Sequence, residues 1–130
     1  MKNVLIIGAG GIGRRHIKGY LSTNRASLSI VEPDDEKINN IQKEFSIDNT
    51  YTSIEKVNLD QFDLAVICSP ANMHVDAMKI CAQNKLSFMV EKPLSISMEG
   101  VDEIIQLVKK NSLFARVGYT RRNSHVSRAL

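Results

Sequence analysis

The most constraining feature of the chain is a glycine-rich turn that directly follows a short apolar segment. Val4 to Ile7 are all apolar, and the next six residues, Gly8 to Gly13, include four glycines. An amphipathic helical pattern begins immediately afterwards. A buried strand that ends in closely spaced glycines and continues into a helix is typical of the first turn of an open, parallel α/β sheet.

The rest of the chain alternates between short apolar strands and amphipathic helices. The expected strands are residues 4–7, 28–31, 64–68, 86–90 and 113–117, with a weaker one near 50–52. Their apolar residues are mostly consecutive, which is typical of strands buried on both faces of a parallel sheet. The order predicts the α/β class: a doubly wound parallel sheet of about six strands in three layers, the Rossmann arrangement, with residues 1–120 forming one domain.

Helices are expected in the intervals between these strands. One has Ile38, Ile41 and Phe45 on a single face, after acidic residues that suit a helix N-terminus. Another is centred on residues 77–81. A third has apolar residues at 101, 104, 105 and 108, the spacing of one helix face, and Ser97 is its expected cap.

The glycine spacing has a chemical reading. Gly8 permits a tight turn, Gly10 lets backbone N–H groups approach a pyrophosphate, and Gly13 lets the helix pack close to the strand. Gly11 and Ile12 complete the loop that is expected to touch the ligand. The helix N-terminus supplies further N–H groups and partial positive charge. The alternative is a glycine-rich turn that binds nothing.

An acidic residue at the end of the second strand completes this dinucleotide pattern. Glu32 follows the expected strand at 28–31 and lies 19 residues after Gly13. Its carboxylate can accept hydrogen bonds from both hydroxyls of an adenosine ribose, whereas a 2′-phosphate would meet its negative charge. We therefore expect NAD rather than NADP as the cofactor, with Arg14 and Lys37 as the nearby cations that could moderate this preference.

Polar residues also follow two later strands. Ser69, Pro70, Asn72 and His74 come after the strand at 64–68, and Glu91-Lys92-Pro93 comes after the strand at 86–90. The carboxyl ends of parallel strands meet at one edge of the sheet, where ligands bind. A lysine beside a nicotinamide can donate to a substrate hydroxyl, and burial there would favour its neutral form.

The proline after Lys92 bears on how that lysine is held. Pro93 restricts Lys92 to extended backbone, which fixes the direction of its ammonium group. The sequence does not decide the isomer of the bond between them: the common form of X–Pro bonds is trans, unless the site demands otherwise.

The segments GAGGIGRRH, CSPANMHVDAMKICAQNKLSFMVEKPLS and RVGYTRR, in this order and spacing, resemble the N-terminal domain of the glucose–fructose oxidoreductase/inositol dehydrogenase/MocA family. The resemblance covers essentially the whole chain. It implies an NAD-dependent oxidoreductase that moves a hydride between a nicotinamide and a hydroxyl or carbonyl group of a sugar, polyol or nucleotide sugar. The substrate partner is thus a small molecule.

The same resemblance assigns roles to residues. Lys92 is implied to be the catalytic residue. Cofactor contacts are implied for Gly8, Gly10, Gly11, Ile12, Gly13, Glu32, Ser69, Pro70, Asn72, His74, Glu91, Lys92 and Arg122. Gly118 and Tyr119 match residues that border the nicotinamide and the substrate, and His16 is expected to be structural.

Family members are longer than this chain and have a second α/β domain that shapes the substrate pocket. Residues 121–130 are expected to begin the connection to that domain, so the 130-residue chain alone is expected to bind cofactor but to catalyse poorly. Full-length members are usually homo-oligomers. This chain alone is compatible with a monomer.

Composition excludes several other classes. Aromatic residues make up 5% and Trp is absent, which argues against a stacking surface for nucleic acid. No segment approaches the roughly 20 apolar residues of a membrane span. Cys68 and Cys81 lie in apolar segments without the spacing of a metal site, so we expect buried free thiols, no metal and a cytoplasmic protein.

Two competing interpretations concern function. A stand-alone NAD-binding or redox-sensing module would share the glycine turn and Glu32. A methyltransferase is disfavoured because no acidic residue precedes the glycines.

Residues 104–130 hold six basic residues and no acidic one. An anion-binding cleft or an interface explains this charge better than binding of nucleic acid does.

Overall fold

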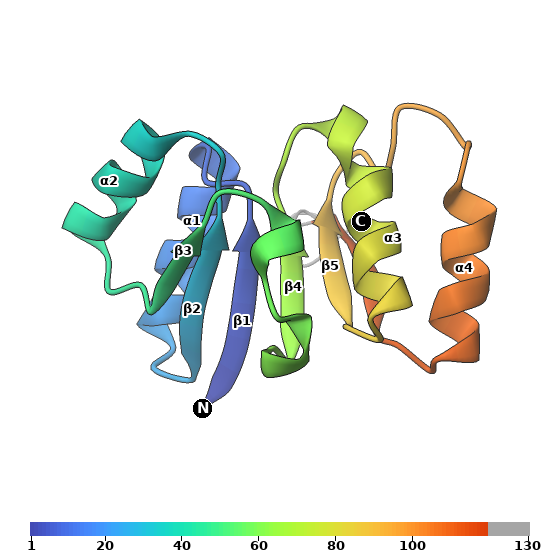
Figure 1. Ribbon diagram of the computed structural model, residues 1–130, viewed down its shortest axis with the longest axis horizontal. Coiled ribbons are helices and arrows are strands. Elements are labelled where there is room, and N and C mark those ends of the chain that lie inside the picture. The colour runs from blue at the N-terminus through green and yellow to red at the C-terminus, as the bar shows by residue number, and fades with distance from the viewer. Residues whose placement is uncertain (120–130) are drawn as a thin grey trace, which may run out of the picture.

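The computed structural model describes residues 1–119 as a three-layer α/β fold (Figure 1). Its six strands form one sheet in the order β3-β2-β1-β4-β5-β6, and all neighbouring strands are parallel. The strands are β1 (Lys2–Ile7), β2 (Ala26–Val31), β3 (Asn49–Tyr51), β4 (Leu64–Ile67), β5 (Phe88–Glu91) and β6 (Ala115–Gly118). The expected doubly wound sheet of six strands is confirmed, with strand ends displaced by one or two residues.

Within residues 1–119, four α-helices and three short 3-10 turns connect the strands. The helices are α1 (Gly11–Ser22), α2 (Asp35–Glu44), α3 (His74–Gln83) and α4 (Val101–Lys110), and the turns are η1 (Ile54–Lys56), η2 (Leu59–Gln61) and η3 (Ala71–Met73). Alternate residues of the strands face opposite helix layers. Val4 and Ile6 pack with Ile17 of α1. Leu5 and Ile7 belong to the cluster that contains Met78 of α3.

The two helix layers explain why the strands are apolar on successive residues. One buried cluster joins the sheet to α1 and α2, and the other joins it to α3 and α4. In β4, Val66 faces the first cluster, while Ala65 and Ile67 face the second. All three are fully buried. The sheet order reverses between β1 and β4, so the loops that follow these two strands diverge to opposite faces and open a crevice at their carboxyl ends.

Helix N-termini agree with the sequence in one case and not in another. Asp34 caps α2: its carboxylate accepts hydrogen bonds from the backbone N–H groups of Glu36 at 2.9 Å and Lys37 at 3.2 Å. The expected cap Ser97 of α4 is wrong. Gly100, with a φ of +79°, occupies the N-cap position, because the chain makes an additional turn between residue 97 and the helix.

One point that the sequence left open is decided, and one expectation needs refinement. The Lys92–Pro93 peptide bond, whose isomer the sequence left open, is cis. Both cysteines are free thiols as expected, but only Cys81 is fully buried and Cys68 is partly exposed. Among residues 1–119, no helix is long and apolar enough to cross a membrane.

Candidate functional site

The glycine loop joins β1 to α1 and brings the chain very close to itself. Gly8 has a φ of +97°, and a Cβ atom there would lie 2.6 Å from the backbone nitrogen of Ser69. A Cβ atom at Gly13 would lie 2.1 Å from the carbonyl oxygen of Gly8. These two glycines are therefore required by the packing of β1, α1 and the loop after β4. They are the tight turn and the close helix–strand approach that the sequence predicted.

The two glycines between them have a different environment. Nothing lies within 4 Å of a Cβ atom built on Gly10 or Gly11. Gly10 is the N-cap of α1 and provides no side-chain cap for the first N–H groups of the helix. The helix N-terminus therefore faces open space with free donors and partial positive charge, an arrangement suited to an anion.

Glu32, one residue beyond the end of β2, is buried, with 5% of its surface exposed. One carboxylate oxygen accepts a hydrogen bond from the backbone N–H of Ala9 at 2.8 Å, and the other accepts one from Asp34 at 3.1 Å. The glycine loop is thereby tied to the end of β2. Each carboxylate oxygen has a second lone pair, so Glu32 keeps acceptor capacity for a ligand.

A cavity of about 730 Å³ extends from Glu32 to the loop after β4. Its lining includes Gly8, Gly10, Glu32, Ser69 and Pro70, together with Lys37. The hydroxyl oxygen of Ser69 is buried and has no hydrogen-bond partner within residues 1–119. An unpaired buried hydroxyl is costly unless a ligand supplies its partner. The open glycine cradle and this hydroxyl therefore fit the pyrophosphate and neighbouring groups of a dinucleotide.

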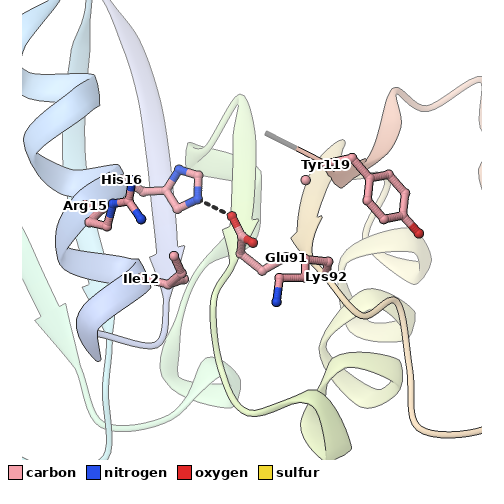
Figure 2. Close-up of a pocket in the computed structure, with 7 residues that line it drawn as sticks. Ile12, Arg15, His16, Glu91, Lys92 and Tyr119 are labelled. Carbon is pink, nitrogen blue, oxygen red and sulfur yellow. Dashed lines mark hydrogen bonds and ion pairs between the residues drawn. The ribbon is translucent and has the colours of Figure 1, made fainter. Parts of the chain in front are cut away.

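A second cavity, of about 560 Å³, lies beside the first turns of α1 (Figure 2). Ile12, Arg15 and His16 line it from α1; Glu91 and Lys92 line it from the end of β5; and Gly118 and Tyr119 complete it. His16 Nε2 and Glu91 Oε1 are 2.6 Å apart. Glu91 is buried with 6% of its surface exposed, and the imidazole fixes the direction of its carboxylate.

Lys92 projects from the end of β5 on the same side as these groups (Figure 2). It is exposed within the described part of the chain. The physical reason is its position, one residue beyond the strand, where the sheet no longer covers it. Its ammonium group is available to a molecule that enters the second cavity.

Cys68 lies between β4 and Ser69 and contributes to the first cavity. Burial, together with the negative charge of Glu91, raises the pKa of its thiol to about 12. The thiol is therefore protonated near neutral pH and is a poor nucleophile. Within residues 1–119, no group of three His, Cys, Asp or Glu side chains is placed to hold a metal ion.

The remaining candidate residues are distributed as follows. Asn72 is exposed in η3 and lines neither of the two cavities. His74 lies beneath the loops with 1% of its surface exposed. Arg122 lies outside the described residues. Sequence reasoning missed Arg15 and the position of His16 in the second cavity, although a spacing of three and four residues from Ile12 places both on the same side of α1.

The fold and the two cavities define a nucleotide-binding domain of the Rossmann type. A family model described as "Oxidoreductase family, NAD-binding Rossmann fold" matches residues 2–119. The chain therefore belongs to this oxidoreductase family, the glucose–fructose oxidoreductase/inositol dehydrogenase/MocA family, and the resemblance seen in its motifs is confirmed.

Individual relatives agree with this assignment. Myo-inositol 2-dehydrogenase of Thermotoga maritima is 27% identical over 119 residues, which are 90% of this chain and 36% of that protein. The NAD-dependent scyllo-inositol 2-dehydrogenase of Bacillus subtilis is 28% identical over 120 residues, 90% of this chain and 35% of that protein. The chain thus spans little more than a third of the length of these relatives.

A solved structure supports the fold. The crystal structure of scyllo-inositol dehydrogenase from Lactobacillus casei, with bound NAD(H) and scyllo-inositol, superposes with a TM-score of 0.90 at 19% identity. The match covers 99% of this chain and 39% of that one. The expected oxidoreductase family, Rossmann fold and NAD-binding character are therefore confirmed.

Proposed function

We propose that this chain is the cofactor-binding part of an NAD-dependent dehydrogenase that acts on a hydroxyl or carbonyl group of a sugar, polyol or nucleotide sugar. The observation that carries the proposal is the position of Lys92. It lines a cavity together with Ile12 of the glycine loop, at the edge of the sheet where Gly10 and Ser69 line the larger cavity. A cofactor and a reacting substrate can therefore meet at this edge.

The larger cavity would hold the adenosine and pyrophosphate. Gly10, Gly11 and the N-terminus of α1 would donate backbone N–H groups to the phosphates, and Glu32 would accept from the ribose hydroxyls. We expect NAD to be preferred over NADP because Glu32 is held in place by Ala9 and Asp34, so its charge would face a 2′-phosphate. Arg14 is engaged by Glu44 and by the ring of Phe45, which leaves Lys37 as the cation nearest the cavity.

The smaller cavity would hold the reacting carbon. When bound, the cofactor supplies a nicotinamide ring that accepts or returns a hydride. As the hydroxyl becomes a carbonyl, the neutral amine of Lys92 would take the hydroxyl proton, and the ammonium group formed would donate a hydrogen bond to the carbonyl oxygen. Glu91 and His16 would fix the wall opposite the ammonium group.

The substrate class rests on the relatives, several of which are named as dehydrogenases of inositols or of UDP-N-acetylglucosamine. We propose a small sugar-like substrate for this chain on that basis. Residues 121–130 would begin the connection to a substrate-binding domain, and the full-length protein would form homo-oligomers. Two free thiols favour a cytoplasmic location.

The test separates cofactor binding from chemistry. The chain, with and without Lys92→Ala, is titrated with NAD⁺ and then incubated with myo-inositol, scyllo-inositol or UDP-N-acetylglucosamine while NADH absorbance is followed. We expect both proteins to bind NAD⁺ with similar affinity, and any NADH formation to be lost in the variant. NADH formation that survives Lys92→Ala would contradict the role of Lys92, and absent NAD⁺ binding would contradict the function as a whole.

A further inference from the structure

His74, the first residue of α3, connects two loops that follow different strands. Its Nε2 atom lies 2.7 Å from the carbonyl oxygen of Ser69, and its Nδ1 atom lies 2.8 Å from the carbonyl oxygen of Pro93. The side chain is almost completely buried, with 1% of its surface exposed. Both polar atoms of the ring are therefore engaged by the backbone, and neither is free to contact a cofactor.

The chemistry of the two partners determines which form of the imidazole fits. A carbonyl oxygen only accepts hydrogen bonds, and a neutral imidazole has a single N–H group. In the neutral ring, one nitrogen lone pair would face a carbonyl oxygen at less than 3 Å, which is repulsive. Both contacts are hydrogen bonds only when both ring nitrogens carry a proton. Two charge-assisted hydrogen bonds would then offset part of the cost of burying the cation.

The two loops joined in this way carry different parts of the site. Ser69 lines the larger cavity, and its backbone nitrogen lies against Gly8. Pro93 directly follows Lys92, the residue exposed to the smaller cavity. A ring fixed at both nitrogens therefore sets the distance between the cofactor loop and the lysine. The strands that precede these loops, β4 and β5, are paired as far as Ile67 and Val90, and the two His74 contacts lie beyond the last paired residues.

We propose that His74 is a positioning residue that is protonated on both ring nitrogens and holds Lys92 in register with the cofactor loop. This inference rests on the proposed function, because the register matters only if cofactor and lysine act together. It assigns His74 a role through Ser69 and Pro93 instead of a direct cofactor contact.

The first experiment examines the ring itself. Nitrogen–proton NMR of the isotope-labelled chain near neutral pH, with the His74 signals assigned by their loss in His74→Gln, reports which ring nitrogens carry protons. We expect two protonated nitrogens in His74 that exchange slowly with water, because the ring is buried. One protonated and one bare nitrogen would overturn the proposal, whether or not any dinucleotide binds.

The second experiment examines the register. Lysine amines are methylated with isotope-labelled methyl groups, and the Lys92 signal is identified by its absence in Lys92→Arg. His74→Phe keeps a ring but removes both N–H groups. We expect it to shift the Lys92 signal and to weaken NAD⁺ binding roughly tenfold, which corresponds to about 1.4 kcal/mol. His74→Gln, which retains an N–H donor, should restore part of the affinity.

Cys81→Ala is the matched control, because Cys81 is fully buried on the same helix but lies in the apolar cluster away from the loops. It should lower the melting temperature while leaving NAD⁺ affinity and the Lys92 signal unchanged. If Cys81→Ala changes the NAD⁺ affinity and the Lys92 signal as much as His74→Phe does, His74 has only a general structural role. If the wild-type chain does not bind NAD⁺, the proposed function fails, while the NMR result still judges the protonation of His74.

Discussion

A Cβ atom at Gly13 would lie 2.1 Å from the carbonyl oxygen of Gly8, far inside the contact distance of two atoms. The N-terminus of α1 therefore reaches the end of β1 only because residue 13 has no side chain. The obstructing atom belongs to the backbone, so it cannot rotate away. This one approach fixes both the start of the helix and the shape of the cavity in front of it.

Gly13→Ala should consequently destabilise the fold. We expect the free energy of unfolding to fall by about 1–3 kcal/mol, because overpacking usually costs this much. Urea denaturation followed by circular dichroism measures it. Gly19→Ala, in the same helix with nothing within 4 Å of the added atom, should instead stabilise by roughly 0.5–1 kcal/mol. Equal stability of Gly13→Ala and the wild type would contradict the packing described here.

Gly10→Ala should separate binding from folding. The backbone of Gly10 has φ −72° and ψ −165°, which any residue adopts, and the added methyl group would meet no protein atom within 4 Å. We expect the melting temperature to change little. NAD⁺ affinity measured by calorimetry should fall at least about tenfold, because the methyl group would occupy the space where the backbone meets the pyrophosphate. Unchanged affinity would mean that the phosphates bind elsewhere.

The contact between His16 and Glu91 should be worth a measurable coupling energy. The two atoms are 2.6 Å apart and Glu91 is buried. A double-mutant cycle with His16→Ala and Glu91→Gln should give a coupling of roughly 0.5–3 kcal/mol in the free energy of unfolding. Effects of the two substitutions that simply add would show that the contact does not hold the carboxylate.

Cys81 should make stability depend on alkaline pH. Burial raises the pKa of its thiol from 9.0 to about 12. Between these values the unfolded chain loses the thiol proton while the folded chain keeps it. The free energy of unfolding is therefore unaffected by this thiol below pH 9.0 and falls as the pH rises toward 12. Urea denaturation at several pH values should show a shallower decline for Cys81→Ala than for the wild type. Parallel declines would contradict the raised pKa.

Much of the fold is predictable from the sequence because its patterns are local. Apolar residues such as Val4 to Ile7 fill successive positions in a strand that is buried on both faces. The acids expected at the N-terminus of α2 include Asp34, and this residue caps the helix. The start of α4 was predicted wrongly because Ser97 and Gly100 are both good N-terminal residues, and only the path of the preceding turn selects Gly100.

The site was predictable to a smaller extent. Gly8, Gly10 and Glu32 meet at one cavity because the ends of parallel strands share an edge, a rule that needs no coordinates. The two carbonyl partners of His74 could not be predicted, because backbone oxygens carry no sequence pattern. The exposure of Lys92 likewise depends on where β5 ends relative to its neighbours.

The central claim is that this domain binds NAD through its glycine loop and Glu32. Calorimetric titration of the chain with NAD⁺, NADH and NADP⁺, in the wild type and in Glu32→Ala, tests it most directly, with exposed Glu36→Ala as the control and a circular dichroism melt of each sample. We predict that NAD⁺ and NADH bind more tightly than NADP⁺, and that Glu32→Ala weakens NAD⁺ binding by roughly tenfold or more and removes the preference. A folded wild-type chain that binds NADP⁺ as tightly as NAD⁺, or that binds no dinucleotide, would contradict it.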